Sequence, residues 1–169
     1  MYKDNTEVKS ALFNGTVLDR ILYNGVEVYK RILDVFKNGV LHESCSFKEY
    51  YNESTIADGT IYNSVSQSTV GTPEHSYCYI NMDLTDYKLL KIKGQYWYGG
   101  TACAIAYGID STSDEYLAMG GNGSEYTIEI DVTEYTGVHY LGIRFTANGM
   151  TSASEWVFLQ NYISEITLE

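Results

Sequence analysis

The chain has 169 residues and a formal net charge of −11, with 44% hydrophobic and 20% charged residues. This composition suits one folded domain with a core, or a modest domain that carries a small extra module. Only 11 Lys and Arg stand against 22 Asp and Glu, whereas nucleic acids and anionic membranes are bound by clustered basic residues. We therefore expect neither a nucleic-acid partner nor a membrane partner.

The beginning of the chain and its cysteines bear on where the protein is made. The first residues, MYKDNTEVKSALFNG, lack the apolar stretch of a secretory signal peptide. The chain has three cysteines, Cys45, Cys78 and Cys103, so they cannot all pair within the chain, and they form no C-x-x-C motif. We therefore expect them to be small buried thiols in a protein made in a reducing compartment.

Three Asn-Gly pairs occur within residues 6–42, at 14–15, 24–25 and 38–39. Each lies between apolar and β-branched runs, which is the strongest short-range signal of a β-hairpin because both turn residues need positive φ. Turns ten residues apart predict a small meander with strands of about eight residues. Such a meander is marginal alone, so we expect residues 1–44 to form an attachment or oligomerisation module.

Residues 43–55 have no clean period and are expected to be a connection. From about residue 56, short strands alternate with turn signals, and no stretch predicts an amphipathic helix. The expected strands cover residues 60–65, 76–84, 87–98, 101–109, 115–119, 126–132, 138–147 and 156–168. Regular spacing of this kind predicts an all-β fold, an antiparallel two-sheet jelly-roll sandwich over residues 45–169, preceded by the hairpin module.

One short motif occurs twice, each time at the end of a predicted strand. Asp83-Leu-Thr85-Asp-Tyr87 matches Asp131-Val-Thr133-Glu-Tyr135, and each is followed by an apolar strand. Asp and Thr side chains can bond nearby backbone at such a corner. We expect two similar corners at which each Tyr folds onto the core, a mark of fold and not of chemistry.

This corner, together with an apolar strand and the aromatic Gly99-Gly100 turn, resembles the carbohydrate-binding-module type of β-sandwich over residues 56–169. The segment LFNGTVLDRILYNGVEVYKR, within residues 6–42, is similar to Asn-Gly hairpin segments in tail and minor structural proteins of phages of Gram-positive bacteria. Together the two resemblances imply a receptor-binding-like virion protein of a phage tail or fibre. Such a protein would be made in the host cytoplasm and would contact other virion proteins and a cell-surface glycan. The fibre likeness also implies a closed homo-oligomer, most often a trimer.

Strand alternation separates core from surface. In residues 101–109 the side opposite the core carries Ala102, Ala104, Ala106 and Gly108, which predicts a shallow floor. The outward side chains that suit stacking on sugar faces or bonding of hydroxyls form the candidate glycan surface: Tyr77, Tyr79, Trp97, Tyr140, Arg144 and Trp156.

Two alternative roles for these aromatics stay open. They would also suit a surface covered by the N-terminal module, or a subunit interface in a purely structural or decorating virion subunit that binds no sugar. A bacterial carbohydrate-binding module is a further alternative.

Motifs of catalysis are not apparent in the sequence. It contains no G-x-S-x-G, H-E-x-x-H or phosphate-binding glycine loop, and His42, His75 and His139 are far apart. His139 alternates with apolar residues and is expected to be a satisfied, buried imidazole. We expect no enzyme and no cofactor; a structural Ca²⁺ at the loop of residues 110–115 is the alternative to a solvated acidic turn.

Overall fold

The computed structural model describes residues 2–3, 6–7, 12–13, 16–17, 20–23, 26–30, 32–50 and 54–169. These residues contain strands and turns but no helix, so the all-β prediction is confirmed. The strands are β1 (Tyr2–Lys3), β2 (Thr6–Glu7), β3 (Leu12–Phe13), β4 (Thr16–Val17), β5 (Arg20–Tyr23), β6 (Val26–Lys30), β7 (Leu33–Lys37), β8 (Val40–Leu41), β9 (Ser46–Tyr50), β10 (Ser54–Ala57), β11 (Thr60–Gln67), β12 (Glu74–Asp83), β13 (Leu89–Gly99), β14 (Ala104–Ile109), β15 (Glu115–Tyr116), β16 (Glu125–Asp131), β17 (Val138–Ala147) and β18 (Val157–Leu168).

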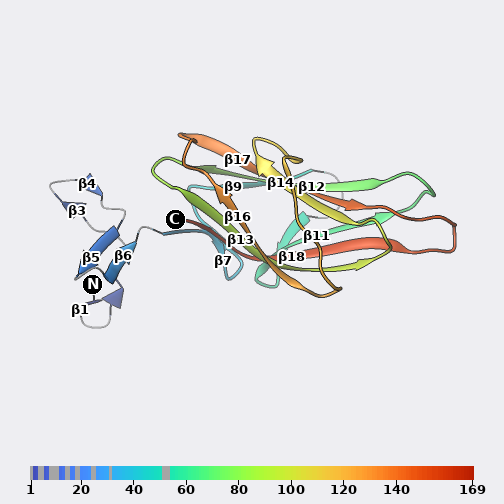
Figure 1. Ribbon diagram of the computed structural model, residues 1–169, viewed down its shortest axis with the longest axis horizontal. Helices are drawn as coiled ribbons and strands as arrows, with labels where there is room; N and C mark the ends of the chain where they lie inside the picture. Colours follow the sequence, from blue (N-terminus) through green and yellow to red (C-terminus); the bar gives the residue numbers. More distant parts are fainter. Residues whose placement is uncertain are drawn as a thin grey trace.

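Two antiparallel sheets form a sandwich (Figure 1). The seven-stranded sheet has the order β10-β11-β18-β13-β16, with β7 beside β18 and β8 beside β7. The five-stranded sheet has the order β15-β14-β17-β12-β9. The last eight strands therefore split between the sheets as β11-β18-β13-β16 and β12-β17-β14-β15, which is the strand order of a jelly roll. The jelly-roll prediction is confirmed.

The N-terminal strands pair locally. β1 pairs with β2, β3 with β4, and β5 with β6, in three separate two-stranded sheets. The expected turns at residues 14–15 and 24–25 lie outside the described residues. The third turn is seen between β7 and β8, where Asn38 and Gly39 both have positive φ, 51° and 79°, as a two-residue hairpin turn requires.

The sequence-based segment boundaries differ from the sheets in two places. β7 and β8 precede residue 44, yet β7 pairs with β18 and so belongs to the seven-stranded sheet. The predicted connection over residues 43–55 is wrong for its described residues, because β9 pairs with β12 and β10 with β11. The polar composition of this stretch hid two edge strands; residues 51–53 lie outside the described residues.

The core lies between the inner faces of the two sheets. Leu90 and Ile92 of β13, and Ile80 of β12, are completely buried, as are Ile163 and Ile166 of β18. The predicted alternation of inward and outward residues holds in β12, β13, β17 and β18. One polar group in this interior is Asn161, whose Oδ1 accepts a hydrogen bond of 2.9 Å from the Tyr126 hydroxyl, as a buried polar atom requires.

The three cysteines are free thiols. Cys78 on β12 is completely buried, as predicted, and burial raises the pKa of its thiol to about 12. Cys45 and Cys103 are only partly buried and pack against the edge of the core, so the expectation of full burial is wrong for these two.

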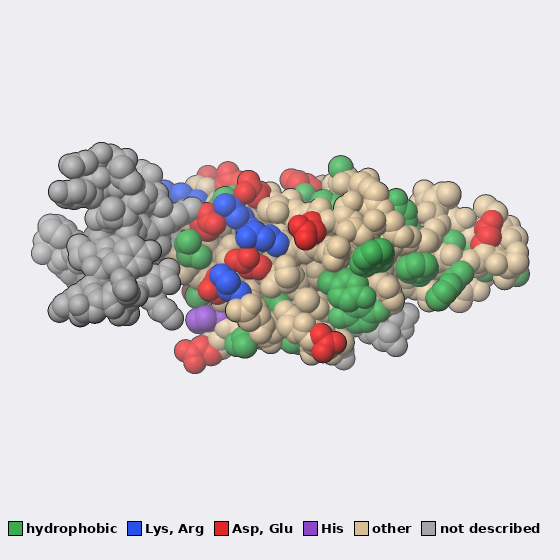
Figure 2. Space-filling model, turned by 90° about the horizontal axis from the view of Figure 1, so that it is seen from below, with side chains coloured by type: hydrophobic (Ala, Val, Ile, Leu, Met, Phe, Trp, Pro, Cys, Tyr) green, Lys and Arg blue, Asp and Glu red, His purple; other side chains and the backbone are tan. Residues whose placement is uncertain are grey.

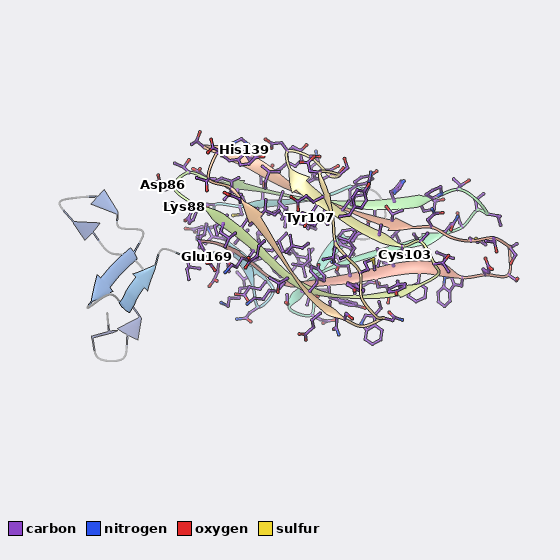
Figure 3. The ribbon with its side chains drawn as sticks, in the orientation of Figure 1. Asp86, Lys88, Cys103, Tyr107, His139 and Glu169 are labelled. Atoms are coloured by element: carbon purple, nitrogen blue, oxygen red, sulfur yellow. The ribbon has the colours of Figure 1, made fainter. Side chains whose placement is uncertain are left out.

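The repeated corner forms as predicted at both strand exits. The Thr85 amide donates to Asp83 Oδ1, and the Thr133 amide donates to Asp131 Oδ1, both at 2.9 Å. Tyr87 is buried, and Tyr135 packs against the core. The labelled residues Asp86, Lys88, His139 and Glu169 mark this end of the sandwich, and Cys103 lies toward the other (Figure 3).

The completely buried Leu159 of β18 offers a test of the core. Leu159→Ala leaves a cavity between the sheets and is expected to lower the free energy of unfolding by about 2–5 kcal/mol. Urea unfolding followed by tryptophan fluorescence measures this change. Val138→Ala is the control, because Val138 is 72% exposed and its loss is expected to cost less than about 0.5 kcal/mol. Equal midpoints for the two variants would contradict the placement of Leu159.

Candidate functional site

The six candidate residues lie on two opposite faces of the sandwich, because their strands belong to different sheets. Tyr77 and Tyr79 on β12, with Tyr140 and Arg144 on β17, lie in the five-stranded sheet. Trp97 lies on β13 of the seven-stranded sheet, and Trp156 directly precedes β18 of the same sheet. The structure therefore brings four of the candidates together and places both tryptophans elsewhere.

The outer face of the five-stranded sheet carries a cluster of three tyrosines. The rings of Tyr77 and Tyr79 are nearly parallel, 6° apart in orientation, with centroids separated by 6.3 Å. The ring of Tyr140 meets Tyr79 edge-on, with centroids 5.5 Å apart. We call this cluster, together with Lys48 and Asn81, the tyrosine face.

An open pocket lies on the tyrosine face. Its lining is Lys48, Tyr79, Asn81 and Tyr140, and its volume is about 410 Å³. The sheet register creates it, because Tyr79 pairs with Lys48 of β9 while Asn81 pairs with Tyr140 of β17. The amide nitrogen of Asn81 donates to Ser46 Oγ at 3.0 Å, which orients this side chain. The pocket thus combines two aromatic rings with an ammonium group and a positioned amide.

The segment of residues 110–117 is a loop that leads into the edge strand β15, and the loop covers part of the floor that the sequence predicted to be open. Gly108 lies beneath the Asp114 carboxylate, since a Cβ at Gly108 would come within 2.5 Å of Asp114 Oδ2. Gly142, which pairs with Tyr79, lies beneath the Ser111 carbonyl oxygen. The shallow-floor expectation is therefore wrong for this part of the strand: the small residues allow the loop to approach the sheet closely.

Arg144 is held by Tyr116 of β15, the edge strand into which this loop leads. Its Nη2 donates to the Tyr116 hydroxyl at 2.8 Å, and its guanidinium carbon lies 5.9 Å from the Tyr116 ring centroid. Arg144 is only partly exposed. This side chain therefore ties β15 to β17 rather than standing free on the surface.

An Asp110–His139 pair fixes the start of the loop next to Tyr140. His139 Nδ1 lies 2.7 Å from Asp110 Oδ2, and His139 Nε2 lies 3.0 Å from the Thr136 carbonyl oxygen. Asp110 Oδ1 also accepts a 3.1 Å hydrogen bond from the Tyr140 amide. Because both ring nitrogens face acceptors, the protonated imidazole is favoured.

The pKa values of the pair shift in opposite directions. The hydrogen bond to Asp110 raises the pKa of His139, and the hydrogen bond from His139 lowers the pKa of Asp110. The prediction that His139 is buried is wrong, since its side chain is 23% exposed near the start of β17. Its ring nitrogens nevertheless have partners, as the sequence predicted.

The other candidate chemical groups are engaged within the fold. Glu115 accepts a 3.0 Å hydrogen bond from the Tyr107 hydroxyl. His75 Nδ1 lies 3.0 Å from Thr146 Oγ1, and burial lowers the pKa of His75. His42 Nδ1 lies 2.8 Å from Ser44 Oγ. In the described part of the chain no group of His, Cys, Asp and Glu is arranged to hold a metal ion.

The outer face of the seven-stranded sheet is divided into two halves (Figure 2). One half carries ion pairs, with Glu165 bound to Lys37 at 3.3 Å and to Lys93 at 3.0 Å. The other half is aromatic and includes Trp97, 44% exposed, and Trp156, 78% exposed.

Sequence reasoning missed two contributors to the outer face of the five-stranded sheet, Lys48 and Tyr116. Lys48 lies on β9, within the stretch that the sequence predicts to be a connection, although Cys45 and Phe47 alternate there with Ser46 and Lys48. Cys45 and Phe47 pack against the core, so this short alternation was the available signal. Tyr116 lies on β15, within the strand that the sequence predicts over residues 115–119, but no pattern in the sequence indicates that it bonds Arg144.

Comparison with known proteins adds no family. No protein-family model matches the chain, and no curated protein sequence matches it. Nowhere in the described ranges is there a helix of the length and apolarity needed to cross a membrane.

The Asp110–His139 pair predicts a pH-dependent loop. Below the ordinary pKa of histidine, about 6.5, the stabilisation by His139 is complete; it is lost as the pH rises through the raised pKa of the folded state. Asp110 contributes in the opposite sense, since its stabilisation is lost as the pH falls through its lowered pKa. Asp110→Asn is expected to lower the pKa of His139 and to speed amide exchange in residues 110–117.

Histidine NMR titration measures this pKa. The titration of His75 is the internal control, because His75 bonds Thr146 and lies away from Asp110 along the sheet register. An unchanged His139 titration in Asp110→Asn would show that the pair does not exist in solution.

Proposed function

We propose that the chain is a non-enzymatic virion protein of a phage tail or fibre, and that its jelly-roll sandwich binds a cell-surface carbohydrate at the tyrosine face. The observation that carries the binding proposal is the open pocket in which Tyr79 and Tyr140 meet edge-on beside Lys48 and Asn81.

The chemistry of the pocket fits a sugar ring. The apolar C–H face of a pyranose packs on a flat aromatic ring, and Tyr79 and Tyr140 offer two such surfaces at a steep angle to each other. The Asn81 amide and the Lys48 ammonium can bond hydroxyl oxygens at the rim. A few positioned polar groups around aromatic walls are typical of small-molecule sites that need orientation as well as contact.

The preorganisation of the pocket supports the same proposal. Tyr79 stacks near Tyr77, Asn81 is bonded to Ser46, and the backbone of Tyr140 is held by Asp110. Side chains that are already positioned lose little conformational entropy when a ligand binds.

The virion part of the proposal rests on the N-terminal segment. The strand pairs β3–β4 and β5–β6 lie on either side of the Asn-Gly pairs at 14–15 and 24–25, which is consistent with the Asn-Gly hairpin segments that residues 6–42 resemble in phage tail proteins. The non-enzymatic part is supported by the engagement of Asp110, Glu115 and the three histidines in bonds within the fold.

A glycan array tests the binding proposal. The parent protein is expected to bind a subset of surface glycans, and Tyr79→Ala and Tyr140→Ala are each expected to weaken that binding by about tenfold or more, because each removes a stacking surface. Val40→Ala is the control, because Val40 is 67% exposed on β8 and belongs to neither the tyrosine face nor the aromatic half of the opposite face. Thermal unfolding of each variant checks that the sandwich remains folded.

Two results would contradict the proposal. The first is a parent protein that binds no glycan on the array. The second is binding that survives both tyrosine substitutions in folded protein.

A purely structural or decorating subunit is the second candidate function. The observation that favours it is Trp156, whose 78% exposure is typical of a residue that another subunit covers. Sedimentation velocity distinguishes the two: a stable oligomer that Trp156→Ala dissociates favours the structural subunit.

A further inference from the structure

A second pocket lies on the outer face of the seven-stranded sheet, away from the tyrosine face. Its volume is about 390 Å³. It is lined by Thr60, Lys93, Gly94, Gln95, Glu125, Tyr126, Thr127, Tyr162 and Ser164. Four adjacent strands, β11, β18, β13 and β16, therefore contribute to one depression.

A β-bulge creates this pocket. The register between β13 and β18 shifts between Lys93 and Gly94, because Lys93 pairs with Glu165 while Gly94 pairs with Ile163. Ser164 is left unpaired in this register, and its hydroxyl donates to the Lys93 carbonyl oxygen at 3.3 Å. Bulges bend a sheet and frequently accompany sites because they redirect side chains.

An aromatic row leads from the pocket along β18. Alternate residues of this strand face outwards, so Tyr162, Gln160 and Phe158 follow one another and Trp156 continues the row. The Tyr162 ring packs on Tyr62, with centroids 5.0 Å apart, and the Phe158 ring packs on Trp156 at 5.3 Å. From residue 156 to residue 162 the row extends for about 20 Å.

Neighbouring strands complete the row. Trp97 of β13 pairs with Gln160, and Gln95 pairs with Tyr162. Gln95 is fixed because its amide nitrogen donates to the Gly123 carbonyl oxygen at 2.8 Å. Gly99 pairs with Phe158, and a Cβ there would come within 2.6 Å of the Phe158 ring, so glycine lets this ring lie close to the sheet. We call the row and its pocket the β18 track.

The charges around the track favour a neutral ligand. The charged side chains that line the pocket are Lys93 and Glu125, of opposite sign. Lys93 is also paired with Glu165 at 3.0 Å. A strongly anionic or cationic ligand would meet a like charge at the pocket, whereas hydroxyl groups can bond to both signs and to the amides of Gln95 and Gln160.

We infer that the β18 track is a second binding site, for an extended neutral oligosaccharide whose sugar rings stack along Tyr162, Trp97, Phe158 and Trp156 and whose terminal residue enters the pocket. This site is separate from the tyrosine face, because the two lie on opposite outer faces of the sandwich. Two sites on one chain would increase the avidity for a polysaccharide surface without any new contact.

Isothermal titration calorimetry with three linear neutral probes, cellohexaose, mannohexaose and maltohexaose, tests the inference on the full chain. At least one probe is expected to bind, and Trp156→Ala and Gln95→Ala are each expected to weaken it by about tenfold. Trp156 is mostly exposed, so its removal leaves the core intact. Tyr79→Ala is the matched control and is expected to leave this affinity unchanged.

Three outcomes would overturn the inference. They are binding of none of the three probes, binding that both track variants retain, and sedimentation of the parent protein as an oligomer that Trp156→Ala dissociates, since a second copy would then cover the track. If the binding of a probe is lost only in Tyr79→Ala, the result supports carbohydrate binding at the tyrosine face and overturns binding at the β18 track. The experiment therefore distinguishes failure of one proposal from failure of the other.

Discussion

The C-terminal strand β18 holds the seven-stranded sheet together by pairing with strands on both of its sides. Its twelve residues pair with β13 along one side, and on the other side with β11 over residues 157–163 and with β7 over residues 165–168. Three segments from distant parts of the chain are therefore joined by this one strand. Its inward side chains, such as Leu159, Ile163 and Ile166, are completely buried, so the same residues supply both the register and much of the core. Because β18 follows all of its partners in the sequence, the seven-stranded sheet cannot close until this strand has been made.

The outward and inward side chains of β18 lie on opposite sides of the seven-stranded sheet, and this sheet separates the two candidate sites. Its outward residues form the β18 track, while its inward residues pack against the sheet that carries the tyrosine face. The chain crosses from one sheet to the other between β12 and β13, so Tyr79 on β12 and Trp97 on β13 are close in sequence and yet lie on opposite faces. The contacts differ between the two faces: Asp110 accepts a hydrogen bond from the Tyr140 amide on one face, and Gly99 and Gly123 let the rings of Phe158 and Trp97 lie close to the backbone on the other.

The sequence was sufficient to predict those features of the fold that depend on neighbouring residues in the chain. Alternation identified the inward residues of β12, β13, β17 and β18, and the repeated Asp-x-Thr-x-Tyr corners formed with the expected bonds. Strand pairing across long separations was not accessible in this way, because nothing local tells whether Tyr77 and Trp97 share a sheet. For the same reason alternation alone groups the six candidates into one surface, although the structure divides them four to two. The loop over Gly108 and Gly142 was missed because small residues in a strand suit an open floor and a close neighbour equally well.

We propose that Tyr79 and Tyr140 form a carbohydrate site on one face, independent of the aromatic residues on the other. Backbone amide chemical-shift mapping by NMR, with a glycan that the array identifies, distinguishes the two faces. We expect the perturbed amides to cluster on β9, β12 and β17 around Lys48, Tyr79, Asn81 and Tyr140, and the perturbations to disappear in Tyr79→Ala. Perturbations confined to β13 and β18, or no perturbation with any glycan, would contradict it.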